Sequence, residues 1–286
     1  TPENAEEAAA NGCARSTVKE TYEFILGDLN KAIELLANTK KTRSDKRYVS
    51  LDVAYGIRAR VHLTMHNYAD ALKDAEAALA STSSVPYSSA AVSKPTFIDI
   101  EDASWMWGIL ITDKDRVSTT GICNFPSHMG SLNYGYASVG GWRRISPKLY
   151  NQIPESDVRK GWFLDDTGVS VNLPAAAQAY ITKKGAPVYT QVKYGPMNDE
   201  WGSNNNATDV ILMRVEEMYL IKAEAQAMNN DVSGGVNTLN SFVNTYRDPS
   251  YKCTATTGEA VQEAVWHQRR IEFWGEGLAY FDIMRL

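Results

Sequence analysis

Two carboxylates near the C-terminus lie among basic and aromatic residues at a spacing that could support chemistry. Glu272 and Glu276 are four positions apart, and Arg269 lies three positions before Glu272, so all three can share one face of a helix. A pair of carboxylates could act as general acid and base. With an arginine this close, the pattern favours a partly buried ion network instead, because buried charge must be paired.

The residues that follow indicate how this helix ends. Gly275 and Gly277 supply the permissive backbone that a helix stop needs. Asp282 and Arg285 then offer a second pair of opposite charges just beyond the turn. We therefore interpret the segment as structural and expect it to close a helical domain.

A glycine-bearing stretch in the middle of the chain, residues 133–144, is the best candidate for a binding site. Glycines allow a loop to expose its side chains, and tyrosine and tryptophan present a flat apolar face with a polar edge. Such rings, flanked by amide and guanidinium donors, suit the apolar faces and hydroxyl rims of sugars. The alternative is that the rings pack the loop onto the helices, since large aromatic side chains are mostly buried. The candidate ligand-binding residues are Asn133, Tyr134, Tyr136, Trp142 and Arg143.

Patterns for metals, cofactors and nucleophilic catalysis are lacking. Cys13, Cys123 and Cys253 are scattered without metal spacing, and their odd number leaves a free thiol. No apolar stretch precedes Cys13, which argues against lipidation there. His62 and His66 are four positions apart, but no carboxylate ligand pattern follows them. Without a phosphate loop, a dinucleotide pattern or a Gly-x-Ser-x-Gly elbow, we expect no catalytic residue, no metal and no cofactor.

Composition bounds the possible partners. The chain has 286 residues, 44% of them hydrophobic, which is enough for a sizeable core. Lysine and arginine number 29 against 34 acidic residues, giving a net charge of −5 without long runs of either sign. Neither nucleic acid nor an anionic membrane surface is therefore an expected partner. No stretch approaches the roughly 20 apolar residues of a membrane span.

Hydrophobic periodicity predicts helices over about residues 17–36, 50–65 and 68–79. Thr17 and Glu20 have the spacing of a capping box, and Ser50 and Asn67 stand where the next two helices begin. The last two predicted helices form a hairpin. Its small residues recur near the C-terminus, because Ala59 to Ala71 and Ala223 to Gly235 are both separations of twelve. The repeat predicts stacked tetratricopeptide-like hairpins, although plain antiparallel helix pairs would explain either copy alone.

The middle of the chain differs from both ends. Eight of the ten prolines and five of the seven tryptophans fall between residues 85 and 209. We predict a mainly α fold with an N-terminal helical hairpin region over 1–82, a long irregular aromatic-rich insert over 83–209, and a C-terminal helical repeat over 210–286. Short strands are expected at Ser104–Ile111 and Val188–Tyr194. Long irregular insertions are usually functional, so the insert is the expected ligand-binding region.

Three segments resemble the SusD/RagB family of cell-surface glycan-binding lipoproteins. They lie in the family's order and span nearly all of the chain. The C-terminal hallmark resembles Arg269–Arg285, except that Leu278 and Ala279 stand where a basic residue is common. Residues 213–225 are similar to the family's helix with Arg-x-x-Glu and Ala-Glu-Ala, and Tyr22–Leu36 to its Asp-Leu helix. Asp157 and Arg159 resemble a further family segment and are expected to form a local structural ion pair.

The resemblance implies a function that the residues alone do not give. It implies a non-enzymatic, lipid-anchored protein on the extracellular face of the outer membrane that takes part in nutrient uptake and polysaccharide utilisation. Its partners would be an oligosaccharide or polysaccharide and a TonB-dependent, SusC-like transporter barrel. Family members are usually longer, so we expect the signal sequence, the lipidated cysteine and the first part of the mature protein to lie upstream of this sequence.

Two other classes of function remain open. A glycoside hydrolase or lyase on a helical scaffold would need two carboxylates roughly 5–10 Å apart across a cleft, and the insert contains several acids. A tetratricopeptide adaptor would bind a peptide in its concave groove. It would not need a long aromatic-rich insert, which counts against it.

Overall fold

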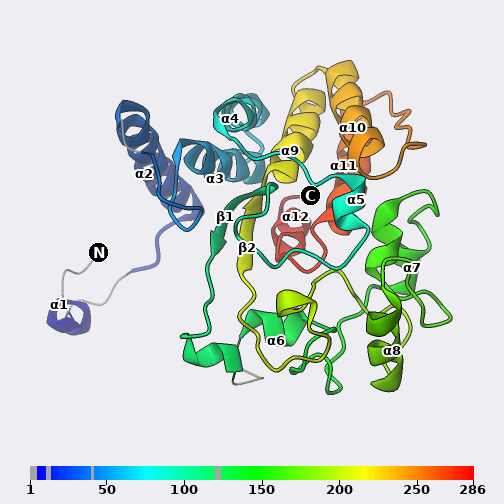
Figure 1. The fold of residues 1–286 in the computed structure, drawn as a ribbon. Helices are drawn as coiled ribbons and strands as arrows, with labels where there is room; N and C mark the ends of the chain where they lie inside the picture. The colour runs from blue at the N-terminus through cyan, green and yellow to red at the C-terminus, as the bar shows by residue number, and fades with distance from the viewer. Residues whose placement is uncertain (1–4, 11–13, 40–41, 120–123) are drawn as a thin grey trace.

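The structure is a computed structural model that describes residues 5–10, 14–39, 42–119 and 124–286. The predicted mainly α fold is confirmed, with a mostly irregular insert between helical parts (Figure 1). The N-terminal helices are α1 (Ala5–Ala10), α2 (Val18–Asn38), α3 (Leu51–Thr64) and α4 (Tyr68–Ser81). The insert holds short helices α5 (Ser89–Val92), η1 (Arg116–Thr119), α6 (Phe125–Met129), α7 (Pro147–Tyr150), η2 (Val158–Trp162), α8 (Ala175–Lys183) and η3 (Met197–Asp199). The C-terminal helices are α9 (Val215–Met228), α10 (Val232–Tyr246), α11 (Gly258–Glu272) and α12 (Ala279–Arg285).

Local sequence signals set the helix boundaries. Thr17 and Glu20 form the capping box that begins α2, with the backbone N–H of Thr17 donating to Glu20 Oε2 at 2.8 Å. Ser50 and Asn67 are the N-cap residues of α3 and α4, as expected from the sequence.

The helices pack as antiparallel hairpins. Helices α3 and α4 contact each other, α4 contacts α9, and α9 contacts α10, so the two hairpins form one stack (Figure 1). In the first hairpin, Ala59 of α3 and Ala71 of α4 are fully buried. In the second hairpin, a Cβ built on Gly235 would lie 2.6 Å from the carbonyl oxygen of Ala223. Small residues separated by twelve positions are therefore buried in the first hairpin and in close contact in the second.

A two-stranded antiparallel sheet leads from the insert into this stack. Strand β1 (Trp105–Ile109) pairs with β2 (Val210–Arg214), and Trp105 lies opposite Arg214 across an irregular register. The expected strand around residues 104–111 is thus present. The expected strand at Val188–Tyr194 is wrong, because this segment makes only isolated bridges, such as that between Phe163 and Gln191. Strand β2 was not expected, and Arg214 ends it as the N-cap residue of α9.

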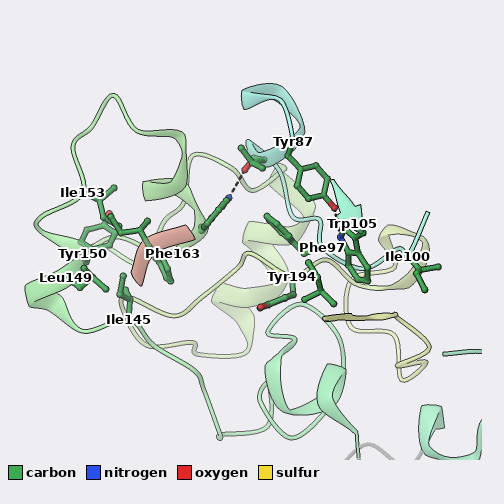
Figure 2. Packing of buried hydrophobic residues seen from close by; sticks show 14 residues of the cluster. Tyr87, Phe97, Ile100, Trp105, Ile145, Leu149, Tyr150, Ile153, Phe163 and Tyr194 are labelled. Atoms are coloured by element: carbon green, nitrogen blue, oxygen red, sulfur yellow. Dashed lines mark hydrogen bonds between the residues drawn. The ribbon is translucent and has the colours of Figure 1, made fainter. Parts of the chain in front are cut away.

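Aromatic residues of the insert form most of one core cluster (Figure 2), which also includes Ile211 of β2 and Ile271 of α11. Phe97 packs edge-on against Trp162, with ring centroids 5.3 Å apart, and against Tyr87 at 4.9 Å. The indole N–H groups are satisfied inside this core: Trp105 donates to Tyr87 Oη at 2.9 Å, and Trp162 donates to the carbonyl of Val92 at 2.8 Å. Trp105 and Trp162 are therefore core residues of the insert.

Candidate functional site

The predicted binding residues lie between α6 and α7, and two of them are exposed. Tyr134 is 47% exposed and Tyr136 is 44% exposed, whereas Asn133 is only 2% exposed. Trp142 and Arg143 are half-buried. The structure thus separates the set into an exposed pair, Tyr134 and Tyr136, which we call the tyrosine platform, and residues that support it.

Tyr136 is held between a histidine and an arginine. Its ring stacks on the ring of His128 at a centroid distance of 4.7 Å, and the guanidinium carbon of Arg143 lies 5.8 Å from its centroid. Arg143 Nη2 is 3.4 Å from His128 Nδ1, which joins the three side chains into one group. A Cβ on Gly141 would lie 2.6 Å from the Tyr136 ring, so only glycine allows the chain to pass there.

Tyr134 contacts a residue that the sequence pattern did not single out. The ammonium of Lys184, at the C-terminal end of α8, lies 5.6 Å from the Tyr134 ring and 5.7 Å from the Tyr180 ring. Tyr180 Oη in turn donates to the backbone carbonyl of Asn133 at 3.3 Å. Tyr180 and Lys184 are four positions apart, a spacing that places them on one helix face. The sequence could have indicated from this spacing that Tyr180 and Lys184 share a helix face. No sequence pattern near Tyr134 indicates that this face lies beside it.

Asn133 supports the platform from below and does not face outward. Its side-chain Nδ2 donates to Asn206 Oδ1, and Asn206 Nδ2 donates to the backbone carbonyl of Tyr134 at 3.2 Å. The Oδ1 atom of Asn133 is buried and lacks a hydrogen-bond partner among the described residues. The role expected of Asn133, bonding sugar hydroxyls directly, does not match this burial. Its position fits a residue that fixes the backbone beneath Tyr134.

Trp142 is also partly committed to packing. It lies against a small buried cluster that includes Leu132, Leu164 and Ile181. Trp201 and Tyr180 pack against the same cluster from other segments. Packing of the Trp142 indole therefore stabilises the insert, and part of the side chain remains exposed. Arg143 is the next residue in the sequence.

A buried ion network ties the insert to the C-terminal segment. Glu272 accepts from Arg214 at 2.9 Å, from Arg247 at 2.8 Å and from Arg159 at 3.2 Å. Burial alone would raise the pKa of Glu272, but these guanidinium groups outweigh it and hold the pKa well below 4.5. Arg159 comes from the insert and also binds Asp157 at 2.6 Å, so that expected pair is confirmed and lies within a larger network.

Lys193 is the second link from the insert. Its ammonium lies 2.6 Å from Glu276, which also accepts from Arg214 at 2.8 Å. Burial lowers the pKa of Lys193 to about 8, against the attraction of Glu276. Because both glutamates of the C-terminal hallmark are engaged by several cations, neither is placed as a free acid or base.

The last helix closes on a separate network. Arg269 does not join the two glutamates; it pairs with Asp282 at 2.8 Å and lies 3.8 Å from Glu217 of α9. Asp282 also binds Arg285 at 2.8 Å, as expected, and Arg285 pairs with Glu224 of α9. The charged segment therefore holds two structural networks, one toward the insert and one toward the helical stack.

Across residues 5–10, 14–39, 42–119 and 124–286, no three His, Cys, Asp or Glu side chains are grouped as a metal site would require. His66 Nε2 lies 2.6 Å from the carbonyl oxygen of Arg285, and Cys253 is a buried free thiol. Cys13 and Cys123 lie outside the described residues. None of the helices in the described part of the chain combines the length and apolar character that a membrane crossing requires.

The fold is a stack of helical hairpins that carries an irregular insert. Buried arginine–glutamate ion pairs connect the insert to the C-terminal segment. These features define a class of helical scaffold proteins. The SusD family model matches residues 147–286 of this chain. Residues 147–286 thus match the SusD/RagB family, and solved structures extend the likeness in fold to nearly the whole chain. A search of curated proteins gave no match.

Three solved structures illustrate the likeness. A SusD-like carbohydrate binding protein from Bacteroides vulgatus is 25% identical with a TM-score of 0.75, over 97% of this chain and 54% of that one. A putative sugar binding protein from the same species is 25% identical with a TM-score of 0.70, over 96% and 55%. Surface glycan-binding protein A from Bacteroides uniformis, at 19% identity and a TM-score of 0.66 over 96% and 58%, shows the fold alone. The chain thus spans just over half the length of these structures.

Proposed function

We propose that this protein is a non-enzymatic glycan-binding component of an outer-membrane nutrient uptake system. The observation that carries the proposal is the tyrosine platform: Tyr134 and Tyr136 are large, exposed aromatic side chains on a backbone that buried contacts hold in place. Exposed rings flanked by cationic donors suit stacking on sugar faces and hydrogen bonding at their rims. Similarity to a SusD-like carbohydrate binding protein supports the same ligand class.

The state of the carboxylates supports binding without catalysis. Glu272 and Glu276 are buried in ion pairs, and Asp157 is bound by Arg159. A glycosidase needs two carboxyl groups free to exchange protons with the sugar across a cleft. The paired acids are therefore structural, and the binding residues we assign are Tyr134, Tyr136, Arg143 and the exposed part of Trp142, with Asn133 supporting them.

The family likeness also supports a proposal for partner and location. We propose that the protein stands on the extracellular face of the outer membrane, anchored by a lipid on an upstream cysteine, and delivers oligosaccharide to a SusC-like, TonB-dependent barrel. Co-purification from membranes of a native host with a tagged form of the protein tests this arrangement. Recovery from the soluble fraction without a barrel partner would contradict it.

Affinity gels that contain single polysaccharides test the function. The parent protein should be retarded by at least one neutral or acidic glycan. The double variant Tyr134→Ala/Tyr136→Ala should migrate as in a gel without glycan, while its melting temperature stays that of the parent. Incubation with the retarding glycan should release no reducing ends. Steady product release that one insert carboxylate variant abolishes would establish the enzyme alternative instead.

A further inference from the structure

Each ring of the tyrosine platform carries a cation. The ammonium of Lys184 lies 5.6 Å from the ring centroid of Tyr134, and the guanidinium carbon of Arg143 lies 5.8 Å from that of Tyr136. Both distances are within the roughly 6 Å over which a cation is attracted to an aromatic face. A ligand that approaches the exposed rings therefore meets positive charge together with the aromatic surface.

The two cations come from different parts of the insert. Lys184 is the C-cap residue of α8, and Arg143 lies just before the bridge between Arg144 and Thr190. Only Gly135 separates the two tyrosines of the platform, so their Cα atoms are at most about 7 Å apart. The fold thus brings two charges from separate segments onto neighbouring rings.

Both cations keep donors that the protein does not use. The Lys184 ammonium makes no hydrogen bond and no ion pair with any described residue. Arg143 Nη2 lies 3.4 Å from His128 Nδ1, whereas Arg143 Nε and Nη1 have no partner in the described part of the chain. These two nitrogens are not sealed from solvent. An ammonium and part of a guanidinium group are therefore available to a ligand.

No carboxylate of the described residues forms an ion pair with either cation. Asp199 and Glu200 belong to a segment that lies beside the platform, because the carbonyl of Ser203 accepts from the backbone N–H of Tyr134 at 2.7 Å. Both acids are exposed, and neither is paired with a cation of the platform. The charge in direct contact with the two rings is therefore positive, although the chain as a whole has a net charge of −5.

We infer that the tyrosine platform takes an anionic glycan, one whose sugar residues bear carboxylate or sulfate groups. This inference rests on the glycan-binding function proposed above and names the ligand class of the same site. The anionic group binds the Lys184 ammonium or the unused N–H groups of Arg143, and the C–H face of the sugar lies against the exposed part of the adjacent ring. A neutral glycan leaves both cations without a counter-charge, and an amino sugar brings like charges together.

Affinity gels with matched pairs of polysaccharides test this charge preference. Each pair keeps the backbone and changes the charge: polygalacturonate and its methyl ester, alginate and carboxyl-reduced alginate, dextran sulfate and dextran. The protein should bind the charged member of at least one pair about 10-fold more tightly than the neutral member, and added salt should reduce the difference. Because the chain has a net charge of −5, general attraction to polyanions would not produce this result.

The outcomes separate this inference from the proposed function. Equal or tighter binding of the neutral members overturns the anionic preference and leaves the glycan-binding function standing. The same holds if none of these six polysaccharides is bound but another, neutral glycan is. If no glycan of any kind is bound, both fail. Binding of a charged member that the double variant Tyr134→Ala/Tyr136→Ala retains would place the anionic site elsewhere and also overturn the inference.

Two adjacent lysines provide a matched pair of variants. Lys184→Gln removes the cation beside Tyr134 and should weaken binding of the charged glycan about 3- to 10-fold, with little change for its neutral partner. Lys183→Gln makes the same change one position away, at an exposed lysine that contacts no aromatic ring of the described residues, and should leave both affinities unchanged. Both lysines are exposed, so both variants should keep the parental melting temperature. Equal affinities of the two variants for the charged glycan would overturn the inference.

Discussion

Lys193 and Glu276 are 83 positions apart in sequence, and their charged groups meet at 2.6 Å inside the protein. Lys193 belongs to the insert, and Glu276 to the C-terminal hallmark, which also receives Arg214 from β2. The same contact therefore joins the insert, which bears the candidate site, to the C-terminal segment.

Removing Glu276 should destabilise the fold. Glu276→Ala leaves Lys193 with its charge buried and only backbone acceptors, so we expect a loss of about 2–4 kcal/mol in the free energy of unfolding. Denaturant unfolding at neutral pH measures it. Glu23→Ala breaks only an exposed pair with Lys19 and should cost less than about 1 kcal/mol. A Glu276→Ala protein with parental stability but no glycan affinity would move the network into the binding site.

The hallmark glutamates should also make the protein sensitive to acid. The pKa of Glu272 and that of Glu276 are lower in the folded state than the usual 4.5. As the pH falls below about 4.5, the unfolded chain therefore takes up protons before the folded chain, and stability falls toward the folded-state pKa values. Above that pH the contribution is fully present.

Urea unfolding between pH 7 and pH 3 should show this loss in the parent protein. Glu272→Gln lacks one of the groups that titrate, so its stability should be lower at pH 7 but fall less steeply with acid. Equal slopes for the two proteins would show that other carboxylates cause the acid sensitivity.

Short-range signals allowed much of the helical scaffold to be predicted. The capping box at Thr17, the N-caps at Ser50 and Asn67, and the close pair of Ala223 and Gly235 each depend on residues near in sequence. Strand β2 escaped prediction because its partner, β1, lies about a hundred positions earlier, and the apolar pattern of residues 210–214 is equally compatible with a helix.

The candidate site was predicted only in part, for the same reason. Glycine and tyrosine content indicated an exposed loop, and Tyr134 and Tyr136 are exposed. The burial of Asn133 depends on Asn206, and the cation beside Tyr134 comes from Lys184. Contacts of this range leave no pattern in the loop itself. Burial decides between a ligand contact and a support, and it is a property of the folded chain.

The hairpin contact makes a prediction with an internal control. Gly235→Ala places a methyl group against the carbonyl oxygen of Ala223, and the helices must separate, which should cost about 1–3 kcal/mol. Gly27 lies inside α2 with nothing within 4 Å of a Cβ built on it. Gly27→Ala should therefore stabilise the protein by about 0.5–1 kcal/mol through helix propensity. Thermal unfolding of both variants checks the opposite signs, and a neutral Gly235→Ala would contradict the close packing.

The last prediction separates platform from support within the candidate site. Tyr136→Ala should lower glycan affinity by about 1–3 kcal/mol, roughly 5- to 150-fold, because an exposed aromatic anchor contributes mainly to binding. Its unfolding free energy should change little, since nearly half of the side chain is exposed.

Trp142→Ala should behave differently, because the indole packs against Leu132, Leu164 and Ile181. We expect it to lose stability, by less than the roughly 3–5 kcal/mol of a fully buried tryptophan, together with part of its affinity. Calorimetric binding and denaturant unfolding of both variants, on the glycan identified by affinity gels, provide the comparison. If Tyr136→Ala is destabilised and binds as tightly as the parent when folded, Tyr136 is a packing residue. The exposed surface that carries the proposed function would then have to lie elsewhere on the insert.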